Sequence, residues 1–161
     1  VLPLVLNAMS TILVIYHSQS GNTRLMAQTV AAGVESVENA VANLKPAGET
    51  SLEDLRTCDG MAIGSPEYFG YMAGMIKDFF DRTYEAATRN PKAFRKPYVL
   101  FISAGNDGRN CRDQIERILT GFRFKKVFEP VISRGTVEQA VLDQCFELGQ
   151  TIAAGCDLEI Y

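Results

Sequence analysis

Short apolar runs alternate with amphipathic stretches along the whole chain, and this alternation limits the fold to a few architectures. Strand-like runs rich in β-branched and other apolar residues lie at 11–16, 40–44, 61–64, 98–103 and 126–132. Stretches with helical periodicity follow them at 22–37, from 51, at 73–87, at 110–120 and from 136. Five successive strand–helix units predict a five-stranded parallel sheet with helices on both faces, a three-layer α/β/α sandwich.

Three local signals refine this prediction. Ser51 and Asp54 have the spacing of a capping box, which predicts that a short helix begins there. Thr136 and Gln139 repeat that spacing at the start of the last helix. Pro130 interrupts the last apolar run, which is typical of an edge strand or a bulge because proline cannot donate to the ladder.

The length of 161 residues favours one domain, which we place at residues 10–161. We interpret residues 1–9 as an N-terminal extension. Its first eight residues are apolar but too few to span a bilayer, and they lack the basic region of a signal peptide. No membrane span is expected.

Charge and cysteine usage exclude several classes of protein. With 16 basic and 19 acidic residues, the net charge of −3 disfavours a nucleic-acid partner, which would need a basic stripe. The single histidine, His17, cannot complete a metal site with cysteines that are far apart in the sequence. We expect reduced, mostly buried thiols in a cytoplasmic protein and no metal; the cysteines are Cys58, Cys111, Cys145 and Cys156.

A loop dense in hydroxyl and amide side chains follows the first strand. Residues 17–23 read His-Ser-Gln-Ser-Gly-Asn-Thr, and Asn22 or Thr23 opens the next helix. Backbone N–H groups at a helix start, with the helix dipole, favour an anion such as a phosphate. Neither the Gly-Lys-Ser/Thr of a P-loop nor a Gly-x-Gly-x-x-Gly fingerprint is present. Because the loop itself has no Lys or Arg, we expect a phosphate pocket free of cationic side chains.

Two further loops follow strands three and four, at the same edge of a parallel sheet. The second loop, residues 64–74, contains three aromatic residues that can cover a flat heteroaromatic ligand: Tyr68, Phe69 and Tyr71. Each ring can instead fold back onto the following helix. The third loop, residues 103–110, has small residues that leave space for the edge of a ring, but on its own it is a generic turn.

These loops resemble those of a known family. The loop 18–23 resembles the FMN phosphate loop of flavodoxins, and the segment 64–83 is similar to the second flavin loop and following helix of two relatives. These are the NADPH-dependent FMN reductases and the tryptophan-repressor-binding-protein type of NAD(P)H:quinone oxidoreductase. The resemblance implies a flavodoxin-like fold with strand order 2-1-3-4-5 and noncovalently bound FMN.

The resemblance also assigns roles to residues, with the chemistry carried by the flavin and no catalytic side chain. The phosphate would be held by the first loop: Ser18, Gln19, Ser20, Gly21, Asn22 and Thr23. The isoalloxazine ring would be flanked by the second loop: Pro66, Glu67, Tyr68, Phe69 and Gly70. Its far side and pyrimidine edge would meet the third: Ser103, Ala104, Gly105, Asn106 and Gly108.

Several functional alternatives remain open at this point. An FMN-dependent enzyme would pass electrons from NAD(P)H to a quinone or flavin acceptor, whereas a flavodoxin would carry single electrons between redox protein partners. The second loop favours the enzyme. A receiver-like signalling domain would need acidic residues where His17-Ser18 and Gly64-Ser65 stand. The oligomeric state is undetermined, and a homo-oligomer is allowed.

Two other groups have alternative interpretations. His17 can contact the phosphate or act as a general acid, but a structural hydrogen bond is the favoured interpretation. A basic cluster follows the third long helix and can attract an NADPH phosphate, although a solvated face is favoured: Arg82, Arg89, Lys92, Arg95 and Lys96.

Overall fold

Parallel strands form the centre of the computed structural model, which describes residues 8–161. The strands are β1 (Ser10–Tyr16), β2 (Ala40–Pro46), β3 (Gly60–Tyr68), β4 (Tyr71–Met72), β5 (Pro97–Ala104), β6 (Lys125–Lys126) and β7 (Val131–Arg134). The main path runs β2-β1-β3-β5-β6, with every neighbouring pair parallel. This order confirms the predicted fold class, since β5 is the fourth long strand along the chain.

The fifth position of the sheet departs from the prediction of one strand over 126–132. Two short strands, β6 and β7, take its place, and both pair with β5 alone. Pro130 lies in the gap between them, where no ladder hydrogen bond is required. The expected edge position is therefore confirmed, and the interruption is long enough to divide the strand.

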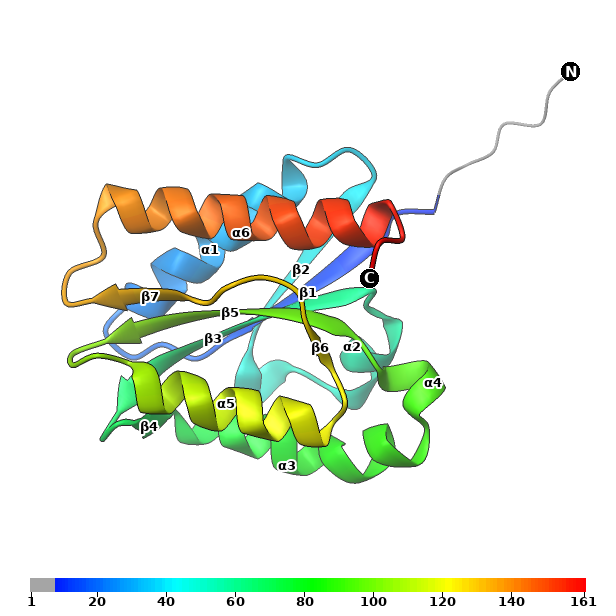
Figure 1. Ribbon diagram of the computed structural model, residues 1–161, viewed down its shortest axis with the longest axis horizontal. Coiled ribbons are helices and arrows are strands. Elements are labelled where there is room, and N and C mark those ends of the chain that lie inside the picture. Colours follow the sequence, from blue (N-terminus) through cyan, green and yellow to red (C-terminus); the bar gives the residue numbers. More distant parts are fainter. Residues whose placement is uncertain (1–7) are drawn as a thin grey trace, which may run out of the picture.

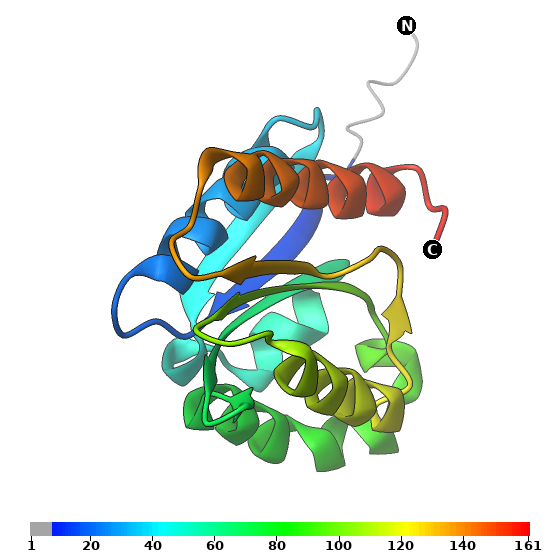
Figure 2. The ribbon, with the colours of Figure 1, turned by 60° about the vertical axis from the view of Figure 1, so that its left-hand side comes forward.

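Helices cover both faces of the sheet, as Figures 1 and 2 show. One face carries α1 (Asn22–Glu35) and α6 (Gln139–Asp157). The other carries α2 (Leu52–Thr57), α3 (Gly74–Arg89), α4 (Pro91–Phe94) and α5 (Arg109–Gly121), with a 3₁₀ turn at Ala47–Glu49. The capping box predicted for α2 is present, because Ser51 and Asp54 each accept the other's backbone N–H.

The last helix begins later than its sequence spacing suggests. Its first residue is Gln139 and its N-cap is Glu138, so Thr136 is not the cap. Gly135 has a positive φ of 75° and donates its N–H to the carbonyl of Ala104. This bond keeps the chain beside β5 after β7 ends, which delays the start of the helix.

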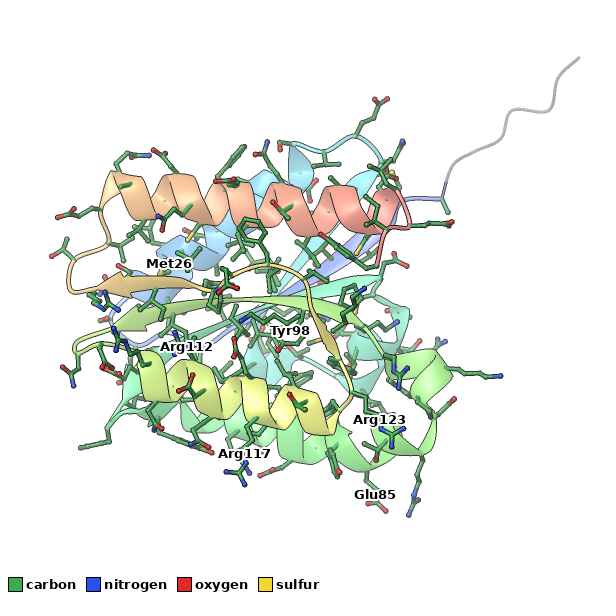
Figure 3. All side chains as sticks on the ribbon, in the orientation of Figure 1. Met26, Glu85, Tyr98, Arg112, Arg117 and Arg123 are labelled. Atoms are coloured by element: carbon green, nitrogen blue, oxygen red, sulfur yellow. The ribbon has the colours of Figure 1, made fainter. Side chains whose placement is uncertain are left out.

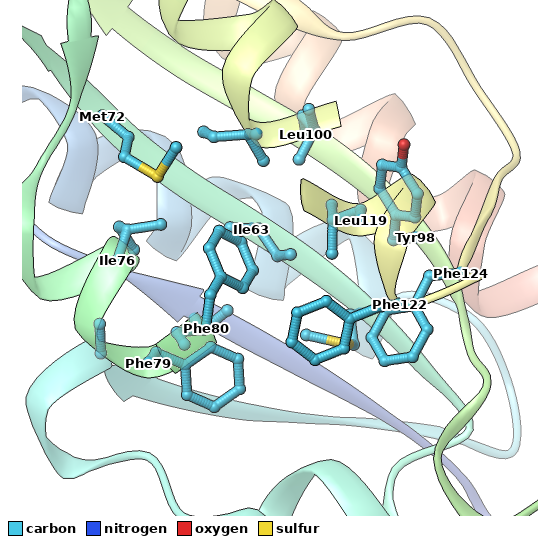
Figure 4. Packing of buried hydrophobic residues seen from close by; sticks show 14 of the residues in the cluster. Ile63, Met72, Ile76, Phe79, Phe80, Tyr98, Leu100, Leu119, Phe122 and Phe124 are labelled. Carbon is cyan, nitrogen blue, oxygen red and sulfur yellow. The ribbon is translucent and has the colours of Figure 1, made fainter. Parts of the chain in front are cut away.

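Two hydrophobic cores lie on the two faces of the sheet. The core beneath α3 and α5 is rich in aromatic rings, and Phe79, Phe80, Phe122 and Phe124 pack there (Figure 4). Tyr84 of α3 is half-exposed, with its ring edge against Phe122.

The helices α1 and α6 on the other face pack with their backbones in contact. A Cβ atom built at Gly33 would lie 2.0 Å from the carbonyl oxygen of Phe146, and one at Gly149 would lie 2.0 Å from that of Val30. Side chains cannot occupy such gaps. The two glycines therefore permit this close crossing of the helices.

The carboxyl ends of the parallel strands meet at one edge of the sheet, on the left in Figure 1, and α4 lies at the opposite edge. The extension predicted at residues 1–9 falls almost entirely outside the described residues. Over residues 8–161, no helix has both the length and the hydropathy that crossing a bilayer requires.

Candidate functional site

The structure brings the three loops predicted from the sequence together at the carboxyl edge. The first two loops meet where the backbone N–H of His17 donates to the carbonyl of Gly64 over 3.2 Å. The first and third meet where the hydroxyls of Thr23 and Ser103 lie 2.7 Å apart. The second and third are joined through Glu67. All sixteen residues predicted to bind the cofactor lie in these three loops or at the ends of the strands and helices next to them.

The first loop presents donors that the protein itself leaves free. Gly21 is the N-cap of α1 and has a φ of 105°, and no side chain caps this end of the helix. Within residues 8–161, no group accepts a hydrogen bond from the backbone N–H of Gln19, Ser20 or Asn22. Ser18 stabilises the loop, because its hydroxyl oxygen accepts the N–H of Gly21 at 3.2 Å. This donor set suits a tetrahedral anion.

A cavity of about 420 Å³ opens beside this loop, and it contradicts one sequence prediction. Its lining includes Arg24 together with residues 16–21 and Pro46. The pocket is therefore not free of cationic side chains. Arg24 lies in the first turn of α1, one residue beyond the polar loop, and its place in that turn was the signal that sequence reasoning missed.

Thr23 does not present an open hydroxyl in this structure. Its side chain is 1 % exposed and bonds to Ser103, which is 8 % exposed. The hydroxyl of Ser103 ties β5 to the first turn of α1. The expected contact of Ser103 with the far side and pyrimidine edge of the flavin stays a prediction. A direct bond between the Thr23 hydroxyl and a phosphate stays a prediction.

The second loop is a β-hairpin rather than an irregular loop. β3 continues to Tyr68 instead of ending at Gly64, and it pairs antiparallel with β4. Phe69 and Gly70 form the turn with φ values of 52° and 73°, the pattern of a two-residue type I′ turn. The pairing of β3 with β4 therefore holds the turn residues Phe69 and Gly70 in a defined position beside the site.

The three aromatic rings of this hairpin divide between the two expected alternatives. Tyr68 and Tyr71 fold back and pack against the core beneath α3 and α5, whereas Phe69 is fully exposed. The Tyr68 hydroxyl is buried without a hydrogen-bond partner among the described residues, so a ligand or water atom can satisfy it. Phe69 is the ring that remains available to a flat ligand.

The third loop is held by the hairpin. The carboxylate of Glu67 accepts the N–H of Asn106 at 3.0 Å and the N–H of Gly108 at 2.8 Å. Gly108 is the N-cap of α5 at a φ of 70°, and a Cβ there would lie 2.9 Å from Ile132. Only glycine fits this corner without strain.

The helices α1 and α5 start at the same edge, and their ends are occupied differently. A carboxylate of the protein, that of Glu67, already lies at the start of α5, where the helix dipole favours an anion. The start of α1 has no such group, and its free N–H donors adjoin the cavity. The residues present therefore fit a phosphate group at α1.

The remaining candidates lie apart from this site. In the basic cluster, Arg82 and Arg89 belong to α3, Lys92 belongs to α4, and Arg95 and Lys96 follow α4. Arg123, which is not a member, is labelled toward the same end of the molecule in Figure 3. Within the cluster, Arg82 and Arg89 pair with Asp78 and Glu85. The favoured interpretation, a solvated face, fits this position. His17 forms no side-chain hydrogen bond within residues 8–161, and its ring meets Tyr68 edge-on with centroids 6.2 Å apart.

The thiols are disfavoured as nucleophiles because the thiolate form is suppressed. All four cysteines are free, and burial raises the pKa of each to about 12. The described residues contain no cluster of His, Cys, Asp or Glu that is suited to hold a metal ion.

Comparisons with known proteins agree with the geometry. Residues 10–139 match the family described as NADPH-dependent FMN reductase. A protein named flavodoxin from Aquifex aeolicus is 42% identical over 73 residues, which are 45% of this chain and 40% of that one. An NAD(P)H dehydrogenase (quinone) from Acidithiobacillus ferrooxidans is 33% identical over 95 residues, 47% of this chain and 48% of that one.

The fold also has close counterparts among solved structures. An archaeal flavodoxin superposes with a TM-score of 0.75 at 26% identity, over 91% of this chain and 98% of its own. The matched part of this chain spans less than half the length of each of the two relatives from Aquifex and Acidithiobacillus.

Proposed function

Since this chain belongs to the NADPH-dependent FMN reductase family and is an FMN-binding redox protein, we propose that it oxidises NAD(P)H and reduces a quinone or a free flavin. The balanced reaction with a quinone consumes NAD(P)H and one proton and yields NAD(P)⁺ and the hydroquinone. When bound, FMN supplies the two-electron chemistry between the nicotinamide and the acceptor.

The protein's part in this reaction is to bind and orient. The free N–H groups of the first loop and the start of α1 would hold the phosphate, with Arg24 adding a positive charge beside it. The isoalloxazine would be flanked by the hairpin, where Phe69 is fully exposed, and its edge would meet the third loop. The single observation that carries this proposal is the uncapped start of α1 beside a cavity, within a sequence that matches the family over 130 positions, residues 10–139.

The carrier function is retained as a second candidate because the relative from Aquifex is named flavodoxin and shares 42% identity over 73 residues. A carrier would exchange electrons with redox protein partners and would turn over no small substrate. The cytoplasmic location stays a prediction.

An anaerobic mixing experiment separates the two functions. The FMN-loaded protein is mixed with NADPH or with NADH, and the visible absorbance of the flavin is followed; free FMN at the same concentration is the control. Rapid bleaching that is faster than the control, with recovery on addition of a quinone, supports the enzyme. If neither nicotinamide bleaches the flavin while dithionite does, the enzyme is refuted and the carrier is favoured.

A further inference from the structure

Glu67 lies where the hairpin and the third loop meet. It belongs to the β3 arm of the hairpin and is half-buried. Each of its carboxylate oxygens accepts one backbone N–H of the third loop, from Asn106 at 3.0 Å and from Gly108 at 2.8 Å. A side chain that makes two bonds to a neighbouring loop is engaged in holding that loop.

The geometry of this contact uses both oxygens of the carboxylate. Both partners are donors, and each N–H meets a different oxygen of Glu67. Gly108 also caps α5, a helix of 13 residues, so the negative charge lies at the positive end of the helix dipole. Glutamine at this position would keep one acceptor and turn its NH₂ group toward an N–H group.

A second contact ties the tip of the hairpin to the same element. The side-chain amide of Asn110, in the first turn of α5, donates to the carbonyl oxygen of Gly70 at 2.6 Å. The hairpin is thus held to the third loop and α5 through Glu67 at its base and through Gly70 at its turn. These two ties fix the position of the third loop relative to the hairpin.

We propose that Glu67 is a positioning residue for the flavin ring, which acts by fixing the third loop against the hairpin instead of flanking the ring itself. This inference rests on FMN binding, the cofactor assignment within the proposed function. Its consequence is a division of labour: Glu67 governs affinity for the ring, and the first loop governs affinity for the phosphate. The sequence resemblance placed Glu67 beside the ring and gave it no such role.

Flavin titrations test this division, because riboflavin has the ring and lacks the phosphate. The dissociation constants for FMN and for riboflavin are measured on the wild-type protein and on Glu67→Gln, Ser20→Ala and Asp54→Asn. We expect Glu67→Gln to weaken both flavins by the same factor, about 10-fold or more, since bonds to a charged group are lost. Ser20→Ala should weaken FMN more than riboflavin.

Asp54→Asn is the control for a general loss of stability. Asp54 caps α2 and pairs with Lys45, and it contacts none of the three loops. This variant should lower the urea midpoint and leave both affinities unchanged. In the flavin-free protein, the amides of Asn106 and Gly108 should exchange with deuterium faster in Glu67→Gln than in the wild type.

The outcomes separate the claims. Wild-type affinity of Glu67→Gln for riboflavin, or a loss confined to FMN, overturns the positioning role. If Glu67→Gln does not fold, Asn110→Ala, which removes the second tie, is measured with the same expectation and the same criterion. None of these titrations involves NAD(P)H. If the protein binds flavin but NAD(P)H does not bleach it, the proposed enzyme function is refuted and the positioning role of Glu67 is still tested by the titrations.

Discussion

The buried hydroxyl pair between α1 and β5 gives a sharp test of how the phosphate loop is anchored. Thr23 and Ser103 share one hydrogen bond of 2.7 Å, and neither hydroxyl has another partner among the described residues. Thr23→Val keeps the shape of the side chain and leaves the Ser103 hydroxyl buried without a partner. Ser103→Ala leaves the Thr23 hydroxyl in the same condition.

The magnitudes follow from the burial of the pair. A buried hydroxyl left unsatisfied costs about 1–3 kcal/mol, so each single variant should lose that much free energy of unfolding. The double variant has no unsatisfied hydroxyl and loses only the net worth of the bond, about 0.5–1.5 kcal/mol. The loss of free energy of unfolding in the double variant should therefore be smaller than the sum of the two single losses, by at least about 0.5 kcal/mol.

Urea denaturation of the flavin-free protein measures all four forms, because bound flavin would add its own stabilisation. The wild type, both single variants and the double variant are compared at one pH and with a common slope. Single losses that add up in the double variant to within about 0.5 kcal/mol would refute the reasoning, because independent sites behave in that way.

Three other perturbations have defined outcomes. Gly108→Ala combines a positive φ with a close contact and should lose about 2–4 kcal/mol in urea denaturation, whereas Gly105→Ala, with nothing within 4 Å of its Cβ, should lose less than about 1 kcal/mol. A smaller loss at Gly108 than at Gly105 would contradict the strain argument. Burial raises the pKa of Asp54, but hydrogen bonds from Lys45 and Ser51 outweigh burial and hold that pKa below its ordinary value of 3.8. The resulting stability is present above that value and is lost as the pH falls through the folded-state pKa, so the urea midpoint should fall less steeply between about pH 5 and about pH 2 in Asp54→Asn than in the wild type. If the urea midpoints of the wild type and of Asp54→Asn fell in parallel with pH, the stabilising role of the ionised Asp54 would be ruled out. Iodoacetamide at about pH 8 should label the folded protein slowly, because burial raises the pKa of every thiol to about 12. After denaturation it should label all four thiols, those of Cys58, Cys111, Cys145 and Cys156. Rapid labelling of the folded protein would show that at least one of these thiols is exposed.

The sequence predicted the layers of the fold because hydrophobic periodicity reports burial directly. The runs 11–16 and 98–103 are buried strands, and the capping box at Ser51 opens α2 as expected. The predictions failed at the ends of elements, where the backbone of another segment decides. β3 runs on to Tyr68 because β4 pairs with it, and that pairing depends on a turn in which Phe69, a non-glycine residue, adopts a positive φ.

The candidate site was predicted as a set of loops but not as a set of contacts. Loop positions follow from the parallel sheet, since the carboxyl ends of strands meet at one edge. Side-chain partners depend on distances between segments far apart in sequence. The pair Thr23–Ser103 spans 80 positions and the pair Glu67–Gly108 spans 41, so no local pattern reports them.

Arg24 illustrates a different limit. The polar loop ends at Thr23, but Arg24 also lines the pocket, because residues of the first helical turn lie close to the start of the helix. A basic residue in the first turn after such a loop therefore belongs with the loop when its charge is considered.

The close crossing of α1 and α6 at Gly33 and Gly149 has a consequence for a site far from either glycine. A side chain at either position would collide with the backbone of the facing helix and would push α1 away from α6. The phosphate loop leads directly into α1, so its place at the edge of the sheet depends on where this helix lies. Two residues that never touch the ligand therefore take part in setting the position of the loop that binds it.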